Sequence, residues 1–256
     1  ALEWHGLKLA VVNARHVKQV PGRKTDINDA QWLAILARSG LLRGGFVPPR
    51  HFREYRLIAR QLQKLTGMAS GERNRLHKLL TDAGIRLSVV VSDLSGKSAQ
   101  AMIKGLLAGE TPEQLLAYAD PRLKASPDDL REALEGDLSD SHRFVIQELM
   151  AHLDELDARI LRFRQTLLKH LSPYQTLLQN LQTLPGIDEF SAAMILVEIG
   201  DDMAAFGSPA KLASWAGVCP GQNESAGKRK SARARKGNPY LRRILCEAAN
   251  AASRTR

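Results

Sequence analysis

The chain has 256 residues, enough for one to three domains, and its 44% hydrophobic and 25% charged residues are ordinary for a soluble globular protein. No apolar run is long enough to cross a bilayer, so a membrane is not an expected partner, and an aromatic content of 5% argues against base stacking on single strands as the main mode of recognition. A net charge of +10 and a pI near 9.9 favour nucleic acid as the partner.

The N-terminal part predicts a buried strand followed by a helix. Residues 7–13 form a short apolar run rich in β-branched residues, and Thr25 or Asp26 can cap the helix that follows. Asp26 and Asp29 are three residues apart, so both carboxylates can face one side of the first helical turn. Such acids can simply cap the helix and complement its dipole. Alternatively, they can bind Mg²⁺, with Lys24 beside a bound phosphate.

Two long amphipathic segments predict a helical arm. In residues 50–82, and more strictly in residues 141–171, apolar residues recur in alternating steps of three and four, the pattern of a coiled-coil seam. Residues 95–135 between them resemble short helices joined by Gly, Pro and Asp turns. The two long helices are expected to pair antiparallel, either as a projecting arm or dimerisation stalk or inside a bundle core. Neither alternative assigns chemistry to this part of the chain.

Residues 175–200 predict a helix-hairpin-helix element, in which the turn Leu184-Pro185-Gly186-Ile187 joins a first helix to an amphipathic second helix capped near Asp188. Gly186 permits backbone N–H groups to approach a phosphate closely at a helix N-terminus, a contact that does not depend on base sequence. Pro185, Gly186 and Ile187 are therefore candidate nucleic-acid-binding residues. An ordinary hairpin of two helices is the alternative.

The last segment concentrates the positive charge around one hydroxyl, that of Ser225. Residues 222–256 carry ten Lys and Arg against two Glu, whereas residues 1–221 carry 27 against 25. Such a density attracts polyanions and makes binding dependent on salt, although a solvated basic loop is the alternative. A final helix is expected with Asn238 as its cap and Pro239 at its first position. The candidate nucleic-acid-binding residues here are Lys228, Arg229, Lys230, Arg233, Arg235, Lys236, Asn238, Arg242 and Arg243.

Four stretches of the chain carry a family resemblance: GRKTDINDAQWLA, LLRGGFVPP, LPGIDEFSAAMILVEIG and LASWAGVCPGQNESAGKRKSARARKGNPYLRRIL. They resemble the DEDD-type bacterial insertion-sequence transposases, a family that is related to the Piv DNA invertase and includes the bridge-RNA-guided recombinases. The resemblance implies a mainly α-helical chain of three parts. These are the C-terminal remainder of a RuvC-like (RNase H-type) α/β domain in residues 1–49, a coiled-coil arm with a small helical insertion in residues 50–172, and a helical transposase domain with the helix-hairpin-helix in residues 173–256.

The same resemblance implies a serine-based chemistry. The last two of the family's four Mg²⁺-binding acids map onto Asp26 and Asp29, and its nucleophilic serine, in an Asn-Glu-Ser-Ala-Gly motif, maps onto Ser225. The hydroxyl would attack a DNA phosphodiester and hold the strand as a phosphoserine, while metal and Arg or Lys spread the charge. The family's first two acids lie upstream of residue 1, and its usual tail lies beyond Arg256. The chain is therefore expected to be truncated at both ends, without a complete metal site of its own.

These features predict a DNA transposase or site-specific recombinase of the bacterial cytoplasm, associated with the nucleoid. Its expected partners are double-stranded DNA, a structured guide (bridge) RNA, and copies of itself in a homodimer or tetramer in which Ser225 of one subunit meets the acids of another. A non-catalytic DNA- or RNA-binding protein or an inactive transposase fragment is the alternative. Cys219 and Cys246 are isolated thiols, which predicts neither a zinc site nor a disulfide framework and fits a reducing cytoplasm.

Overall fold

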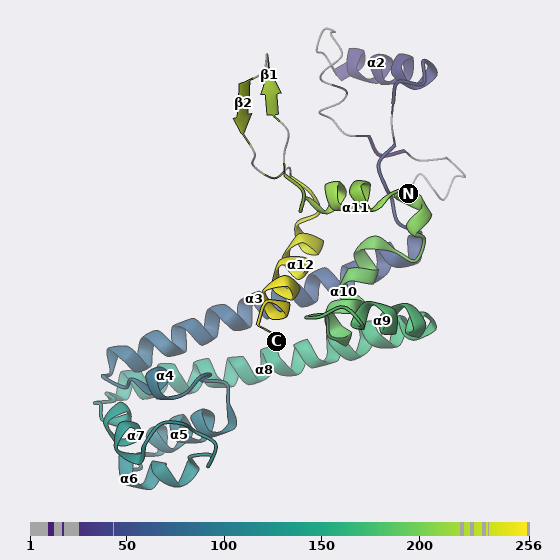
Figure 1. Ribbon diagram of the computed structural model, residues 1–256. Coiled ribbons are helices and arrows are strands. Elements are labelled where there is room, and N and C mark those ends of the chain that lie inside the picture. The colour runs from purple at the N-terminus through teal and green to yellow at the C-terminus, as the bar shows by residue number, and fades with distance from the viewer. Residues whose placement is uncertain are drawn as a thin grey trace. The chain divides into compact units, whose positions relative to one another are not determined.

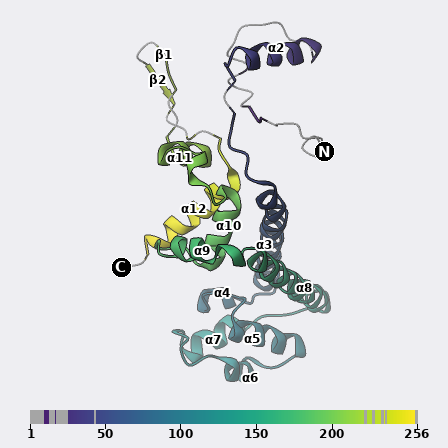
Figure 2. The same cartoon turned by 90° about the vertical axis from the view of Figure 1, so that its right-hand side faces the viewer.

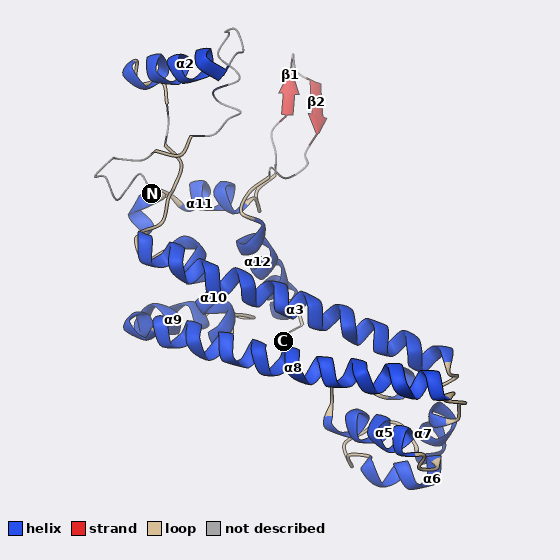
Figure 3. Cartoon of the chain, turned by 180° about the vertical axis from the view of Figure 1, so that it is seen from behind, coloured by secondary structure: helices blue, strands red, loops and turns tan. Residues whose placement is uncertain are grey.

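The protein is described by a computed structural model that covers residues 10–12, 17, 26–42, 44–220, 223–225, 228–231, 234 and 236–254. Within these residues the chain is mainly helical, as expected, and it also contains a two-stranded antiparallel hairpin (Figure 1, Figure 3). The chain divides into two compact units. The first unit combines Ala1–Arg56 with Leu171–Arg256, and the arm unit comprises Leu57–His170.

The arm unit is built on two long helices, α3 (Arg50–Asp82), which enters it at residue 57, and α8 (Asp140–His170). They lie side by side and run antiparallel, and they share one apolar core (Figure 1, Figure 3). Leu76 of α3 and Leu156 of α8 are almost completely buried in this core. At the edge of the seam Arg73 Nη2 lies 2.7 Å and 2.8 Å from the two carboxylate oxygens of Asp157. The apolar pattern of the sequence therefore predicted both helices and their pairing correctly.

A small helical insertion packs against the C-terminal part of α3 and the N-terminal part of α8. Two of its helices begin with reciprocal capping boxes, in which Thr111 pairs with Gln114 and Ser126 with Asp129. Met102 and Leu115 are fully buried and extend the core of α3 and α8. The elements of the insertion are α4 (Leu87–Val90), α5 (Lys97–Ala108), α6 (Pro112–Leu115), η2 (Leu116–Tyr118) and α7 (Pro127–Leu134).

The first unit is centred on α10 (Glu189–Ile199), which packs against α9 (Gln175–Gln182) and α12 (Pro239–Ala252) (Figure 1, Figure 2). Every residue from Ala192 to Ile199 is buried, whereas the sequence pattern predicted an amphipathic helix. The difference arises because neighbouring helices cover more than one side of α10, and an apolar helix is stable where no face meets water. The other elements of this part are η3 (Ser172–Tyr174), η4 (Met203–Ala205), α11 (Pro209–Ala216), β1 (Asn223–Ser225) and β2 (Lys228–Ser231).

The N-terminal part contributes helix α2 (Asp26–Arg38), as expected for this stretch, and Thr25, one of the two candidate caps, lies outside the described residues. Of the predicted strand at residues 7–13, only residues 10–12 are described, and there Val12 forms an isolated antiparallel bridge with Gly44. Gly45 N–H also donates a hydrogen bond of 2.7 Å to the carbonyl of Val11. A RuvC-like domain stays a prediction for this part.

None of the described helices is a candidate for a membrane span. In the described part of the chain, no helix combines the length and the apolar character needed to cross a bilayer.

Candidate functional site

Ser225 is the last residue of β1 and pairs with Lys228, the first residue of β2. The hairpin is irregular between Asn223 and Glu224, where a bulge shifts the register. The paired residues are Asn223 with Ser231, Glu224 with Arg229, and Ser225 with Lys228. The serine motif thus lies directly across from the first residues of the basic segment.

The sequence pattern of this stretch indicated a basic segment or loop and no strands. Charged and small residues fill it, so it lacks the alternation of apolar and polar residues that normally signals a strand. A usable signal was the spacing: two residues, Ala226 and Gly227, separate Ser225 from Lys228, and a glycine in a two-residue link is typical of hairpins.

The two chain segments that lead into and out of the hairpin meet between α11 and α12. Gly217 ends α11 with a left-handed φ of 77°. A Cβ atom at Gly237 would lie 2.3 Å from the backbone nitrogen of Gly217, so only glycine fits there. The next residue, Asn238, donates its backbone N–H to the carbonyl of Trp215 over 3.0 Å. Backbone contacts therefore join the end of α11, before the hairpin, to Gly237 and Asn238, after it, and these residues are called the hairpin base.

Asn238 begins α12 as predicted, and Pro239 occupies the first helical position. The side-chain Oδ1 of Asn238 accepts hydrogen bonds from the backbone N–H groups of Tyr240 (3.0 Å) and Leu241 (3.1 Å). Its Nδ2 donates to Oε2 of Glu198 over 2.6 Å. Both polar atoms of this side chain are thus engaged inside the protein, and a contact of Asn238 with nucleic acid stays a prediction.

Glu198 is 1% exposed and is the only polar or charged residue that is fully buried in the part of the chain for which burial is described. A buried carboxylate is tolerated only when charge and hydrogen bonds compensate its lost hydration. Arg56 supplies the charge, because its Nε lies 3.2 Å from Glu198 Oε2. Arg56 also donates to the carbonyls of Val197 and Glu198. Neither residue was predicted from the sequence, although an acid within the apolar run of residues 192–199 was a visible signal.

A turn joins α9 to α10, and in it Gly186 has a left-handed φ of 79°. The assignment of these elements as a helix-hairpin-helix stays a prediction. A Cβ atom at Gly186 would lie 2.2 Å from the carbonyl oxygen of Ala248, so this glycine is required for close approach of α12. The structure thus gives the glycine a packing role that differs from the predicted phosphate contact.

The start of α10 is acidic. Asp188 caps it as predicted, accepting a hydrogen bond of 2.7 Å from the backbone N–H of Ser191, and Glu189 follows in the first turn. These negative charges occupy and complement the helix N-terminus that the sequence analysis proposed for a phosphate. Phosphate contacts of Pro185, Gly186 and Ile187 stay a prediction that this geometry does not support.

Asp26 and Asp29 both lie in the first turn of α2, and the side chain of Asp29 is exposed. Carboxylates are hard oxygen donors of the kind that Mg²⁺ binds together with several waters, so the chemistry of these two residue types suits this ion, while the side chain of Asp26 is not described. No group of three or more His, Cys, Asp or Glu side chains suited to a metal ion occurs among the described residues. The Mg²⁺ site stays a prediction.

The candidate cations are described to different extents. Lys236 is exposed, and so are Arg242 and Arg243 in the first turns of α12. Nε of Arg243 lies 2.8 Å from Oε1 of Glu247. For Lys228, Arg229 and Lys230 only the backbone of β2 is described, and Lys24, Arg233 and Arg235 lie outside the described residues.

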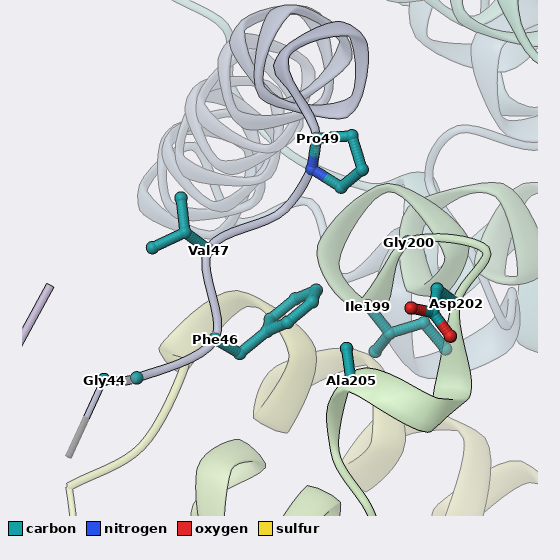
Figure 4. A pocket seen from close by; sticks show the side chains of 9 residues that line it. Gly44, Phe46, Val47, Pro49, Ile199, Gly200, Asp202 and Ala205 are labelled. Atoms are coloured by element: carbon teal, nitrogen blue, oxygen red, sulfur yellow. The ribbon is translucent and has the colours of Figure 1, made fainter. Parts of the chain in front are cut away.

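A cavity of about 420 Å³ opens in the first unit between the segment before α3 and the end of α10. The ring of Phe46 extends toward Ile199 (Figure 4) and also packs on Phe206 and Trp215, with ring centroids 4.3 Å and 5.5 Å away. Because no cation is among the residues that line this cavity, the cavity does not suit a phosphate. The lining residues are Gly44, Gly45, Phe46, Val47, Pro49, Ile199, Gly200, Asp202 and Ala205.

Two protein-family models match the two ends of the chain. One, a DEDD model of IS110 type described as transposase, matches residues 1–85, which include Asp26 and Asp29. The other, described as transposase of the IS116/IS110/IS902 family, matches residues 178–256, which include Ser225. No curated protein matches the chain significantly.

Proposed function

Since the chain belongs to the IS110-type insertion-sequence transposases, we propose that it cuts and rejoins double-stranded DNA through a covalent bond to Ser225. The observation that carries the proposal is the hairpin register. It places the motif serine opposite Lys228, at the start of a strand whose first three residues are all cations.

In the proposed reaction, Oγ of Ser225 attacks a phosphorus atom of the DNA backbone. A bond forms between Oγ and phosphorus, the bond to one ester oxygen of the DNA breaks, the serine proton passes to a base, and the leaving oxygen takes up a proton. The number of phosphate ester bonds is unchanged. A hydroxyl of a second DNA end can therefore attack the phosphoserine, restore the serine and rejoin the strands without an external energy source.

The charged residues have separate proposed roles in this reaction. Lys228 and the cations that follow it hold phosphates and balance the charge that develops on the phosphoryl group. Mg²⁺, held in part by Asp26 and Asp29, would supply further stabilisation of that charge. Phosphates of a structured guide RNA would suit the same basic segment, and a homodimer or tetramer would let the acids of one subunit meet the serine of another.

The direct test is a search for DNA linked to Ser225. The full-length protein is incubated with a library of random-sequence double-stranded DNA, with and without Mg²⁺, and covalent species are separated under denaturing conditions. We expect a DNA-linked species that forms only with Mg²⁺ and that mass spectrometry assigns to the peptide containing Ser225. Tight DNA binding without any covalent species would instead favour a non-catalytic nucleic-acid-binding protein.

The basic segment is expected to determine the salt dependence of DNA binding. Replacing Lys228, Arg229 and Lys230 together with glutamine should weaken binding and reduce the slope of log K against log salt by about 2 to 3, because each neutralised phosphate contributes about 0.9. Fluorescence anisotropy between about 50 and 200 mM salt measures this slope. A matched triple replacement in the arm unit, at Lys97, Lys104 and Lys124, should leave it unchanged. Equal losses of slope in both triples would contradict the assignment.

A further inference from the structure

We propose that Glu198 is a positioning residue for Ser225, acting through Asn238 at the base of the hairpin. This inference rests on the proposed role of Ser225 and adds a residue that neither the motif nor the charge pattern identifies. It concerns the described contacts of α10, α12 and the hairpin base, all of which lie in the first unit.

The hairpin depends on its base for orientation. The described register contains three residue pairs, and two-stranded hairpins of this size are marginal alone in water. Its segments carry charged and small residues and so offer no apolar face for packing. The described contacts that can fix the direction of the hairpin lie at Gly217, before it, and at Gly237 and Asn238, after it.

Asn238 is the point at which that base is held to the buried interior. Its backbone N–H donates a hydrogen bond to the carbonyl of Trp215, and its Nδ2 donates one to Glu198. Its Oδ1 accepts the hydrogen bonds that cap α12. Since the capping bonds fix the orientation of the amide, Nδ2 can only point in one direction, and Glu198 Oε2 lies there at 2.6 Å. The start of α12 is thereby set relative to α10.

Burying a carboxylate at position 198 costs hydration free energy, which points to a specific role for Glu198. An apolar side chain would suit the remainder of the run from Ala192 to Ile199, and replacing buried ion pairs with apolar residues is often neutral or stabilising. An apolar residue would, however, leave Nδ2 of Asn238 without this acceptor and Arg56 without this counter-charge. Glu198 accepts the hydrogen bond from Asn238 and pairs with the charge of Arg56.

Two variants test the contact: one adds a negative charge at Asn238, and the second compensates that charge at Glu198. Asn238→Asp keeps the side-chain volume and a good helix cap, but it replaces the donor that faces Glu198 with a second carboxylate. We expect this variant to form the Ser225–DNA species roughly tenfold to a hundredfold more slowly, because small displacements of reacting groups have effects of this size. We also expect faster trypsin cleavage within residues 228–236 of the free protein.

The double variant Asn238→Asp/Glu198→Gln should recover most of both losses. In it the glutamine amide at position 198 can donate to the new carboxylate, and the cluster with Arg56 returns to the single negative charge of the wild type. A general loss of stability would lower the melting temperature in both variants without this recovery, so the double variant separates positioning from a merely structural effect. Asn250→Asp, on the exposed face of α12, makes the same change of charge and should behave like the wild type.

Two results would overturn the inference: a double variant no better than Asn238→Asp alone, or trypsin cleavage in Asn238→Asp no faster than in Asn250→Asp. Failure of the proposed function is recognised separately. If the wild-type chain forms no Ser225–DNA species at all, the serine assignment is wrong, whereas the cleavage comparison and its recovery in the double variant still decide whether Glu198 and Asn238 hold the hairpin.

Discussion

Replacing Ser225 with alanine is expected to abolish the covalent protein–DNA species while changing DNA affinity by no more than about twofold, the range typical of surface substitutions that break no special contact. The substitution removes the one atom that would bond to phosphorus. It leaves the backbone pairing with Lys228 and the cations of β2 intact. Denaturing gels measure the covalent species, and anisotropy at fixed salt measures the affinity.

Ser231 offers a matched control for this variant. It lies in β2 opposite Asn223, so it belongs to the same hairpin and has the same side chain, but it is outside the Asn-Glu-Ser-Ala-Gly motif. Ser231→Ala should form the covalent species at the wild-type rate. A species that persists in Ser225→Ala, or is lost equally in Ser231→Ala, would remove Ser225 from the proposed role.

The largest expected effect on stability comes from Gly186→Ala. Alanine at this position would adopt a left-handed φ of 79° and place its Cβ 2.2 Å from the carbonyl oxygen of Ala248. The left-handed backbone costs roughly 1–2 kcal/mol and overpacking typically another 1–3 kcal/mol, so we expect the free energy of unfolding to fall by roughly 2–5 kcal/mol. Denaturant unfolding of the first unit, followed by a probe on α12, measures this loss.

Gly71→Ala is the matched control for Gly186→Ala. Gly71 lies inside α3, where a Cβ atom would meet nothing within 4 Å. Alanine is the better helix former, so this change should raise the free energy of unfolding by roughly 0.5–1 kcal/mol. If Gly186→Ala were tolerated as well as Gly71→Ala, the close contact between the turn and α12 would not exist in solution.

The long helices and the helix caps could be predicted from the sequence because their signals are local. The steps of three and four in residues 50–82 and 141–171 mark buried faces, and Asp188 and Asn238 are placed where the backbone needs an acceptor. The apolar run of α10 was recognised as a helix. Its complete burial was missed because the number of neighbours around a helix is not encoded in its own period.

The missed parts of the site depend on contacts between distant residues. Glu198 contacts Arg56 and Asn238, which lie 142 and 40 residues away in the sequence. One acid in an apolar run does not reveal such partners. Similarly, Gly186 was predicted to let backbone N–H groups approach a phosphate, whereas the close approach that the structure describes there is to the backbone of α12. The family resemblance located Ser225, and only the strand register showed which cation lies across from it.

The contact of Gly186 with Ala248 also sets an order for assembly during synthesis. The turn before α10 has its partner among the last residues of the described chain, and Ala252 closes the same contact. A nascent chain still attached to the ribosome can build the arm unit from residues already released, but α10 remains partly uncovered until α12 emerges. The contacts of Asn238 with Trp215 and Glu198 likewise form only after residue 238 has left the ribosome.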